Sequence, residues 1–156
     1  MEIKPYAQEN LEAVLRLIRE TLFAVNIRYY PLEEIYKYSK KYARENFCAM
    51  LRTRRVFVAF EDDVLCATGA YEPLSEGRCE VNGLFVCGDR IKQGLGTRML
   101  LFLEAQARAQ GARELFLYST LGAKPFYEKF GYRALRLDKG YGYPMEKRIG
   151  QTISFF

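Results

Sequence analysis

The 156-residue sequence contains no histidine and no tryptophan. The missing histidine excludes Ser-His-Asp and Cys-His nucleophile pairs, and it excludes zinc or haem held by imidazole. It also removes the side chain that most often carries protons at neutral pH. If the chain is an enzyme, its proton chemistry must therefore use Glu, Asp, Tyr, Cys, Lys, backbone groups or water.

Long apolar runs are also missing, since no stretch approaches the roughly 20 residues that span a bilayer. The opening MEIKPYAQEN has an early acid and no apolar core, so we do not interpret it as a signal peptide. The four cysteines at 48, 66, 79 and 87 form no CxxC pair and have no zinc spacing, and we interpret them as small buried hydrophobes. These observations predict a reduced, cytoplasmic protein with no membrane partner.

Apolar and aromatic residues are plentiful, with 49% hydrophobic residues, 12 tyrosines and 11 phenylalanines, which is enough for a sizeable core. With no repeat and no linker-like stretch, we expect a single domain over 1–156. Residues 1–77 carry a net charge of −1 and residues 78–156 a net charge of +6. This asymmetry favours an anionic partner for the C-terminal half.

Hydrophobic periodicity predicts two helices in the N-terminal part, over 10–23 and 32–51, after a short strand at 2–6. Two β-rich runs at 56–60 and 64–71 predict a hairpin. In the second helix, the residues expected to face inward are Leu32, Ile35, Tyr36, Tyr42, Ala43, Phe47 and Met50.

The C-terminal half alternates strands and helices. A strand over 78–86 contains Gly83, and a glycine within a strand often marks a bulge or a close approach of a ligand. An apolar helix follows from Gly94 and ends at Gly111. The remaining elements are a strand at 114–120, a helix at 124–130, and strands at 132–138 and 141–149 with Gly140 between them.

The element order is thus β-α-α-β-β-β-α-β-α-β-β. We expect an α/β (α+β) fold with a mixed, mostly antiparallel central sheet flanked by helices. One crossover helix would join the strand at 78–86 to the strand at 114–120.

The most informative stretch is LFVCGDRIKQGLGTRML, residues 84–100, in which a strand leads through a glycine-containing loop into an apolar helix. The unpaired N–H groups and the dipole of a helix N-terminus favour anions, and glycine lets a phosphate approach the backbone. The P-loop pattern fails because Gln93 stands where its second glycine belongs. The dinucleotide fingerprint fails because its third glycine is replaced by Met99.

A third phosphate-binding pattern does match, and through it the chain resembles the GNAT superfamily of N-acetyltransferases. Leu84-Phe85-Val86 stand in the right register to Gly94-Leu95-Gly96. AKPFYEKFGY at 123–132 is similar to the late helix of the family, and PMEKRI at 144–149 is similar to its final strand. One departure is Ile91, where the family usually has Arg or Gln.

The resemblance implies that acetyl-CoA is the co-substrate and that no metal takes part. By this resemblance, acetyl-CoA would lie between the parallel strands 78–86 and 114–119. Its pantetheine arm would bind along Leu84, Phe85 and Val86, and Thr120 stands where many members have an asparagine near that arm. The residues whose amides would hold the pyrophosphate are Lys92, Gln93, Gly94, Leu95, Gly96 and Thr97.

The reaction implied by the resemblance is direct attack of an amine on the thioester. Without histidine, a carboxylate is the expected base, and Glu80 matches a glutamate that serves as base in several members. By period two we expect Glu80 to share a face with Asn82, Leu84 and Val86. Tyr127 matches the tyrosine of the late helix and is the expected general acid.

Other interpretations stay open. A non-catalytic acyl-CoA sensor of the same fold would fit Ile91 and Thr120. A nucleic-acid module would rest on the arginines at 52–55 and on the tyrosines between 29 and 42, but we do not favour it because several of those tyrosines have helical spacing. The acceptor is expected to be a small-molecule or peptide amine, bound near residues 26–31 and 141–143, and a homodimer is left open.

Overall fold

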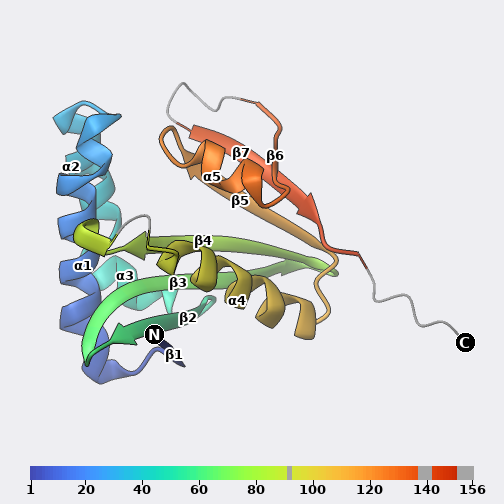
Figure 1. Ribbon diagram of the computed structural model, residues 1–156, viewed down its shortest axis with the longest axis horizontal. Coiled ribbons are helices and arrows are strands. Elements are labelled where there is room, and N and C mark those ends of the chain that lie inside the picture. The colour runs from blue at the N-terminus through green and yellow to red at the C-terminus, as the bar shows by residue number, and fades with distance from the viewer. Residues whose placement is uncertain (91–92, 137–141, 151–156) are drawn as a thin grey trace, which may run out of the picture.

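The sheet runs through the strands in the order β1-β2-β3-β4-β5-β7-β6 (Figure 1). The computed structural model describes residues 1–90, 93–136 and 142–150. Neighbouring strands are antiparallel except β4 and β5, which are parallel and joined by a crossover helix. The strands are β1 (Glu2–Pro5), β2 (Arg55–Glu61), β3 (Val64–Ser75), β4 (Arg78–Val86), β5 (Glu114–Thr120), β6 (Arg133–Ala134) and β7 (Gly142–Arg148).

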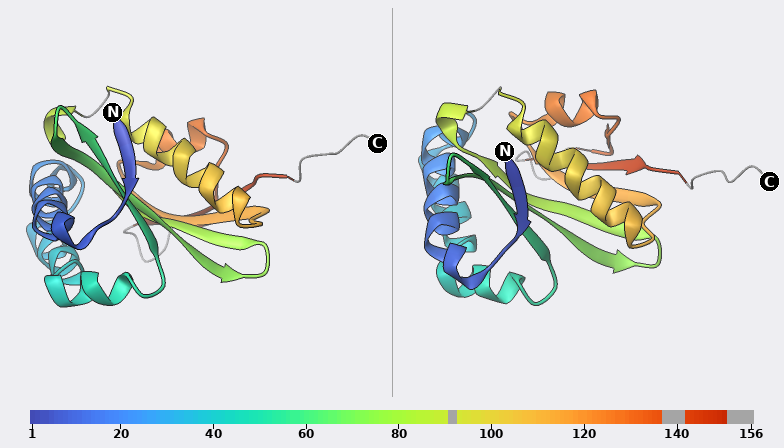
Figure 2. Two further views of the ribbon diagram at one scale, coloured as in Figure 1. Left: turned by 90° about the horizontal axis from the view of Figure 1, so that it is seen from below. Right: turned by 60° about the horizontal axis from the view of Figure 1, so that its bottom comes forward.

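Helices cover both faces of this sheet, with α1 to α3 on one face and α4 and α5 on the other (Figure 2). The predicted α/β fold with a mostly antiparallel sheet is therefore confirmed. The α-helices are α1 (Leu11–Ala24), α2 (Leu32–Lys41), α3 (Arg44–Met50), α4 (Leu95–Ala109) and α5 (Lys124–Lys129). Short 3-10 turns are η1 (Gln8–Asn10), η2 (Asn26–Arg28) and η3 (Gly88–Arg90).

Two hydrophobic cores fill the spaces between these layers. Apolar residues of α1 recur at helical spacing, so they bury one face of the helix against β2, β4 and the α2–α3 segment. On the opposite face, Met99, Leu100 and Leu103 of α4 are fully buried against β3 to β5. Here α4 approaches β3 so closely that a Cβ on Gly69 would lie 2.8 Å from the Leu103 side chain.

The predicted helix over 32–51 is wrong as a single element, because the chain leaves helical geometry at Tyr42 and Ala43. The Asn46 side chain donates a hydrogen bond to the Lys40 carbonyl at 2.8 Å across the break. The inward face was also misassigned in part, since Leu32 and Tyr36 are about half exposed. The segment therefore forms two short helices, α2 and α3, in place of one.

The two predicted C-terminal strands differ in outcome. Of the strand expected over 132–138, the described residues 132–136 form a strand only at Arg133–Ala134, and β7 covers most of the other one. Gly140, the predicted turn between them, lies outside the described residues.

All four cysteines are free, and burial raises the thiol pKa of Cys66, Cys79 and Cys87.

Candidate active site

The gap between β4 and β5 is the feature around which the predicted site residues gather. The two parallel strands are paired only at their first residues, where Arg78, Cys79 and Glu80 of β4 face 114–116 of β5. Beyond Glu80 the strands diverge (Figure 1). The backbone edges of the later residues therefore lack the partner strand that a continuous sheet would give them.

A bulge at Gly83 changes which side chains share a face. Between Thr68 and Ala70 the β3–β4 register shifts, so β4 carries one extra residue there, and Gly83 has a φ of +61°. The extra residue inverts the alternation of side chains. The prediction that Glu80 shares a face with Leu84 and Val86 is therefore wrong, because both leucine and valine pack in the α4 core.

The backbone of β4 after the bulge turns the polar groups of two residues toward the gap. Cys87 N–H donates to the Cys66 carbonyl of β3 at 2.9 Å. Since backbone groups alternate in direction along a strand, those of Leu84 and Val86 point away from β3, toward the gap. The Val86 carbonyl accepts a hydrogen bond from the Thr21 hydroxyl of α1 at 3.2 Å, a contact that the sequence did not predict. Phe85 instead packs with the α1 core.

The N-terminus of α4 lies against the end of β4. Gly94 has a φ of +82°, a conformation that glycine adopts without strain. Arg98 N–H closes the first turn onto the Gly94 carbonyl at 3.0 Å, which leaves the amides of residues 95–97 without partners in the helix. A Cβ on Gly96 would lie 3.7 Å from the Val86 side chain. Gln93 lies just before this turn, while Ile91 and Lys92 fall outside the described residues.

Tyr127 comes to the same region from α5. Its side chain is 9% exposed, and its ring lies edge-on to Phe126 and to Tyr132, with centroids 5.1 Å and 5.7 Å apart. Burial raises the pKa of its phenol, and the nearby Tyr42 hydroxyl raises it further. Tyr42 belongs to the α2–α3 break, on the other side of the sheet, so the Tyr127 phenol is within electrostatic reach of that side. Tyr127 is thus a neutral hydroxyl that holds its proton.

Glu80 lies on the α1–α3 face at the point where β5 begins to diverge. In register it stands between Glu72 of β3 and Phe116 of β5. Burial raises the pKa of the Glu80 carboxyl, and the Glu72 charge adds to the rise, whereas Arg54 and Lys41 lower it. The carboxylate is therefore held partly buried within a mixed set of charges.

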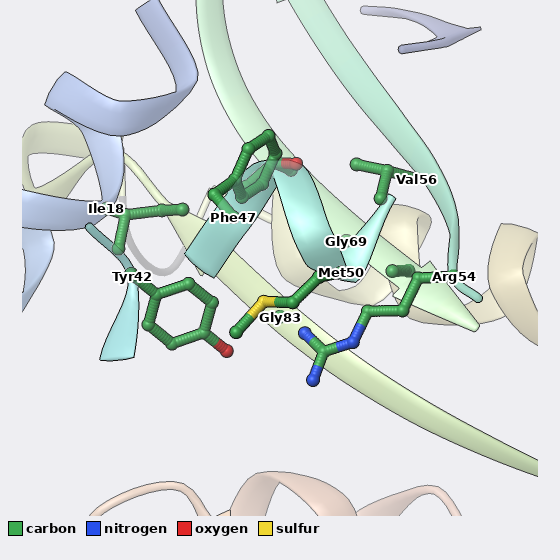
Figure 3. A pocket seen from close by; sticks show the side chains of 10 residues that line it. Ile18, Tyr42, Phe47, Met50, Arg54, Val56, Gly69 and Gly83 are labelled. Carbon is green, nitrogen blue, oxygen red and sulfur yellow. The ribbon is translucent and has the colours of Figure 1, made fainter. Parts of the chain in front are cut away.

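Tyr42 and Arg54 also lie on this face, although neither was predicted from the sequence as a site residue. Figure 3 shows the Tyr42 hydroxyl and the Arg54 guanidinium on the same side of a small cavity that the Gly83 bulge helps to line. The Tyr42 ring lies edge-on to Phe85 with centroids 5.3 Å apart. Arg54 lowers the pKa of both the Tyr42 phenol and the Glu80 carboxyl, so the three side chains lie near one another.

The far end of the gap is bridged by the segment between α1 and α2. The Leu121 amide, just after β5, donates a hydrogen bond to the Tyr30 hydroxyl at 2.9 Å. The Tyr29 ring covers Gly122, where a Cβ would lie 2.5 Å from the ring. Burial raises the pKa of Tyr38 on α2 to about 12. The expected acceptor segment at 26–31 is therefore beside the gap, whereas of 141–143 only residues 142 and 143 are described.

Thr120 ends β5 at this bridge. Its carbonyl accepts hydrogen bonds from the Ser119 hydroxyl at 2.7 Å and from the Ala123 amide at 3.2 Å. These bonds fix the turn that leads into α5 and so position Tyr127. The Thr120 side chain lies on the face opposite the buried Ser119.

The described residues contain no group of three or more Cys, Asp or Glu side chains placed to hold a metal ion. Over the same ranges, no helix has the length and apolar character needed to cross a membrane.

Residues 12–132 match the Acetyltransferase (GNAT) family. The chain therefore belongs to the GNAT acetyltransferase family. A search of curated protein sequences gives no match.

Solved structures with the same fold are similar over nearly the whole chain. PaiA N-acetyltransferase from Thermoplasma acidophilum, in complex with coenzyme A, is 23% identical with a TM-score of 0.83, covering 94% of this chain and 98% of its own. An aminoglycoside 6'-N-acetyltransferase complexed with coenzyme A is 20% identical with a TM-score of 0.73, covering 99% and 100%. N-acetylglutamate synthase from Neisseria gonorrhoeae is 16% identical with a TM-score of 0.74, covering 96% of this chain but 35% of its own.

Proposed function

We propose that this protein is an acetyl-CoA-dependent N-acetyltransferase that moves the acetyl group to a primary amine by direct attack. The observation that supports it most is the coincidence of three features at one place. β4 and β5 diverge, the first turn of α4 presents unused amides beside Val86, and Tyr127 enters from α5. Family membership over 12–132 adds the reaction class.

In this proposal the cofactor arm lies along the β4 edge that β5 leaves free. The backbone groups of Leu84 and Val86 that point toward the gap would bind the amides of the arm as a neighbouring strand does. Amides of residues 94–97 at the α4 N-terminus would bind the pyrophosphate, where the helix dipole favours negative charge. The net charge of +6 over residues 78–156 supports an anionic ligand on this half.

Acetyl-CoA supplies an acetyl group activated as a thioester. The acceptor reaches it from the α1–α3 face, where Glu80 takes one proton from the ammonium, directly or through a water. The amine nitrogen then bonds to the carbonyl carbon while the carbon–sulfur bond breaks. Tyr127 donates its proton to the leaving sulfur and regains the second proton of the amine, so the products are an amide, free CoA and one proton on Glu80.

The acceptor is an amine of small-molecule or peptide type, and the walls beside Glu80 suit a partly apolar one. Phe116 and Tyr42 present rings there, while Glu72 and Glu80 present carboxylates. Aromatic rings and carboxylates both attract an ammonium group. Tyr118 of β5 is 56% exposed on this face and leaves it open to an entering acceptor.

Two measurements test the proposal in sequence. A rise in the thermal midpoint with CoA, which saturates as CoA exceeds its Kd, would support the cofactor site. Release of free thiol from acetyl-CoA is then followed with a panel of amines, and we expect at least one to accelerate it over the rate without amine. CoA binding with no acceleration by any amine would favour a sensor, and no binding at all would refute the cofactor assignment.

A further inference from the structure

The side chain of Asn82 is buried at both of its polar atoms, the amide oxygen and the amide nitrogen. Within the described part of the chain, neither atom has a hydrogen-bond partner. Buried amides are almost always bonded, because a buried donor or acceptor that loses water without gaining a partner is destabilising. An apolar side chain would suit this position better if packing were its only task.

Asn82 lies where the reaction is proposed to occur. It is two residues beyond Glu80, the last β4 residue that pairs with β5, and its predecessor Val81 is buried in the α4 core. Asn82 therefore faces the α1–α3 side, as Glu80 does. Hydrogen bonding from the Asn82 amide lowers the pKa of the Glu80 carboxyl, although the contact is not aligned as a regular hydrogen bond. Only the Nδ2 of the amide can donate to a carboxylate, so the Oδ1 atom has no partner among the described residues.

The described groups that follow Asn82 along β4 do not form a hydrogen bond with its amide either. Gly83 follows directly, and the Arg54 guanidinium lies 3.9 Å from the place of a Cβ on that glycine. The bulge at Gly83 then turns Leu84 and Val86 to the opposite face. Asn82 is thus the last side chain that β4 presents to the α1–α3 face before the backbone positions proposed for the cofactor arm.

The geometry points to Asn82 as the group that holds the acceptor amine, and this inference rests on the proposed function. Its Oδ1 accepts one N–H of the amine, while Glu80 takes the proton that the ammonium must lose. The nitrogen lone pair is then left free to point toward the gap, where the thioester carbonyl would lie. The bond that Asn82 lacks in the free protein is made by the acceptor.

The test replaces the amide with an apolar side chain of similar size, Asn82→Leu. Because no regular hydrogen bond is lost in the free protein, the thermal midpoint of the variant should equal or exceed that of the wild type. Acetyl-CoA affinity should stay within about twofold, while kcat/KM for the acceptor falls at least about tenfold, as expected for one lost hydrogen bond to substrate. The acceptor is the fastest amine among spermidine, kanamycin, glutamate and a lysine-containing peptide.

A matched control is Asn46→Leu, which removes an asparagine whose Nδ2 donates to the Lys40 carbonyl at 2.8 Å. This variant should show a lower thermal midpoint and an unchanged kcat/KM, the opposite of Asn82→Leu. If Asn82→Leu does not fold, Asn82→Ala carries the same expectation for kcat/KM.

The outcomes separate this inference from the function beneath it. Wild-type kcat/KM in Asn82→Leu, with the wild-type protein acetylating the same amine, would overturn the role of Asn82 alone. A thermal midpoint below that of the wild type would reveal a structural bond and would also overturn it. If the wild-type protein acetylates none of the four amines, the proposed function fails and the inference fails with it.

Discussion

At the scale of single residues, burial adjusts two titratable groups in directions that suit opposite tasks. It raises the pKa of the Glu80 carboxyl, which makes the carboxylate a stronger proton acceptor. It also raises the pKa of the Tyr127 phenol, so that this hydroxyl keeps its proton at neutral pH. Without histidine, the chain thus pairs a carboxylate and a phenol for the two proton transfers.

Glu80→Gln should change both activity and the pH dependence of stability. The wild-type kcat/KM should rise with pH through a midpoint above 4.5, the usual value, because the base must be ionised, and the variant should lack this rise. The folded state binds the Glu80 proton more tightly than the unfolded state, so wild-type stability falls as pH increases through this window. In thermal melts from acid to neutral pH, the thermal midpoint of the variant should therefore rise relative to that of the wild type as pH increases. Parallel curves would contradict the raised pKa.

Tyr127→Phe should lower kcat by about 10²-fold, the smaller end of the effect of a general acid, with little change in acetyl-CoA affinity. The matched control is Tyr36→Phe, which removes a hydroxyl from a tyrosine that is 53% exposed. Steady-state kinetics and CoA titration on both variants check this. Equal kcat values in the wild type and in Tyr127→Phe would remove the residue from the chemistry.

The sequence predicted the elements that carry Glu80 and Tyr127 better than it predicted the directions of the side chains along β4. Glu80 and Tyr127 follow from motifs whose spacing is local. Glu80 was predicted to share a face with Asn82, Leu84 and Val86, and this is wrong for Leu84 and Val86. The bulge at Gly83 inserts one residue into β4 and inverts the alternation of side chains after Asn82. Gly83 had indicated a bulge, but its consequence for Leu84 appears only once the strand is paired.

At the scale of elements, the start of α4 was predictable and the end of α2 was not. Gly94 and Gly111 bound α4 through backbone conformations that favour glycine, so the sequence alone indicates both ends. Apolar spacing continues across Tyr42, however. Two contacts accompany the end of the helix. The Tyr42 ring packs edge-on against Phe85, and the Asn46 side chain donates a hydrogen bond to the Lys40 carbonyl.

Gly96→Ala should separate a ligand requirement from a folding requirement. A Cβ at Gly96 meets only ordinary contacts of 3.7 Å or more, and alanine is the better helix former by about 0.8 kcal/mol. The thermal midpoint of the free protein should therefore not fall. CoA affinity should fall at least about tenfold, because the Cβ stands where the pyrophosphate would approach. The control Gly88→Ala, with no contact nearer than 3.8 Å, should bind CoA normally. Unchanged CoA affinity in Gly96→Ala would place the phosphate elsewhere.

At the scale of the whole molecule, the sheet separates two cores, and a buried ion pair links the α4 side to the last strand. Glu104 of α4 is 5% exposed, and it accepts hydrogen bonds from Lys147 of β7 at 2.8 Å and from the Tyr132 hydroxyl at 3.1 Å. The order of the elements along the chain could be predicted from periodicity. This network could not, because nothing in the spacing of α4 tells a buried glutamate from a solvated one.

Lys147→Met should lower the free energy of unfolding by about 3 kcal/mol, since it leaves the Glu104 carboxylate buried without its cation. The control is Arg133→Met, which breaks an exposed pair with Glu146 and should cost no more than about 0.5 kcal/mol. Denaturant titration of both variants gives the comparison. Equal small losses would show that solvent reaches Glu104.

The most direct test of the account follows the acetyl group itself. Acetyl-CoA labelled in its acetyl carbon is incubated with the wild-type protein and an amine that accelerates thiol release, and the amine is then analysed by mass spectrometry. We predict that the label appears in an amide of the acceptor in a one-to-one ratio with the thiol released. Thiol release with the label in free acetate would contradict transfer to an amine.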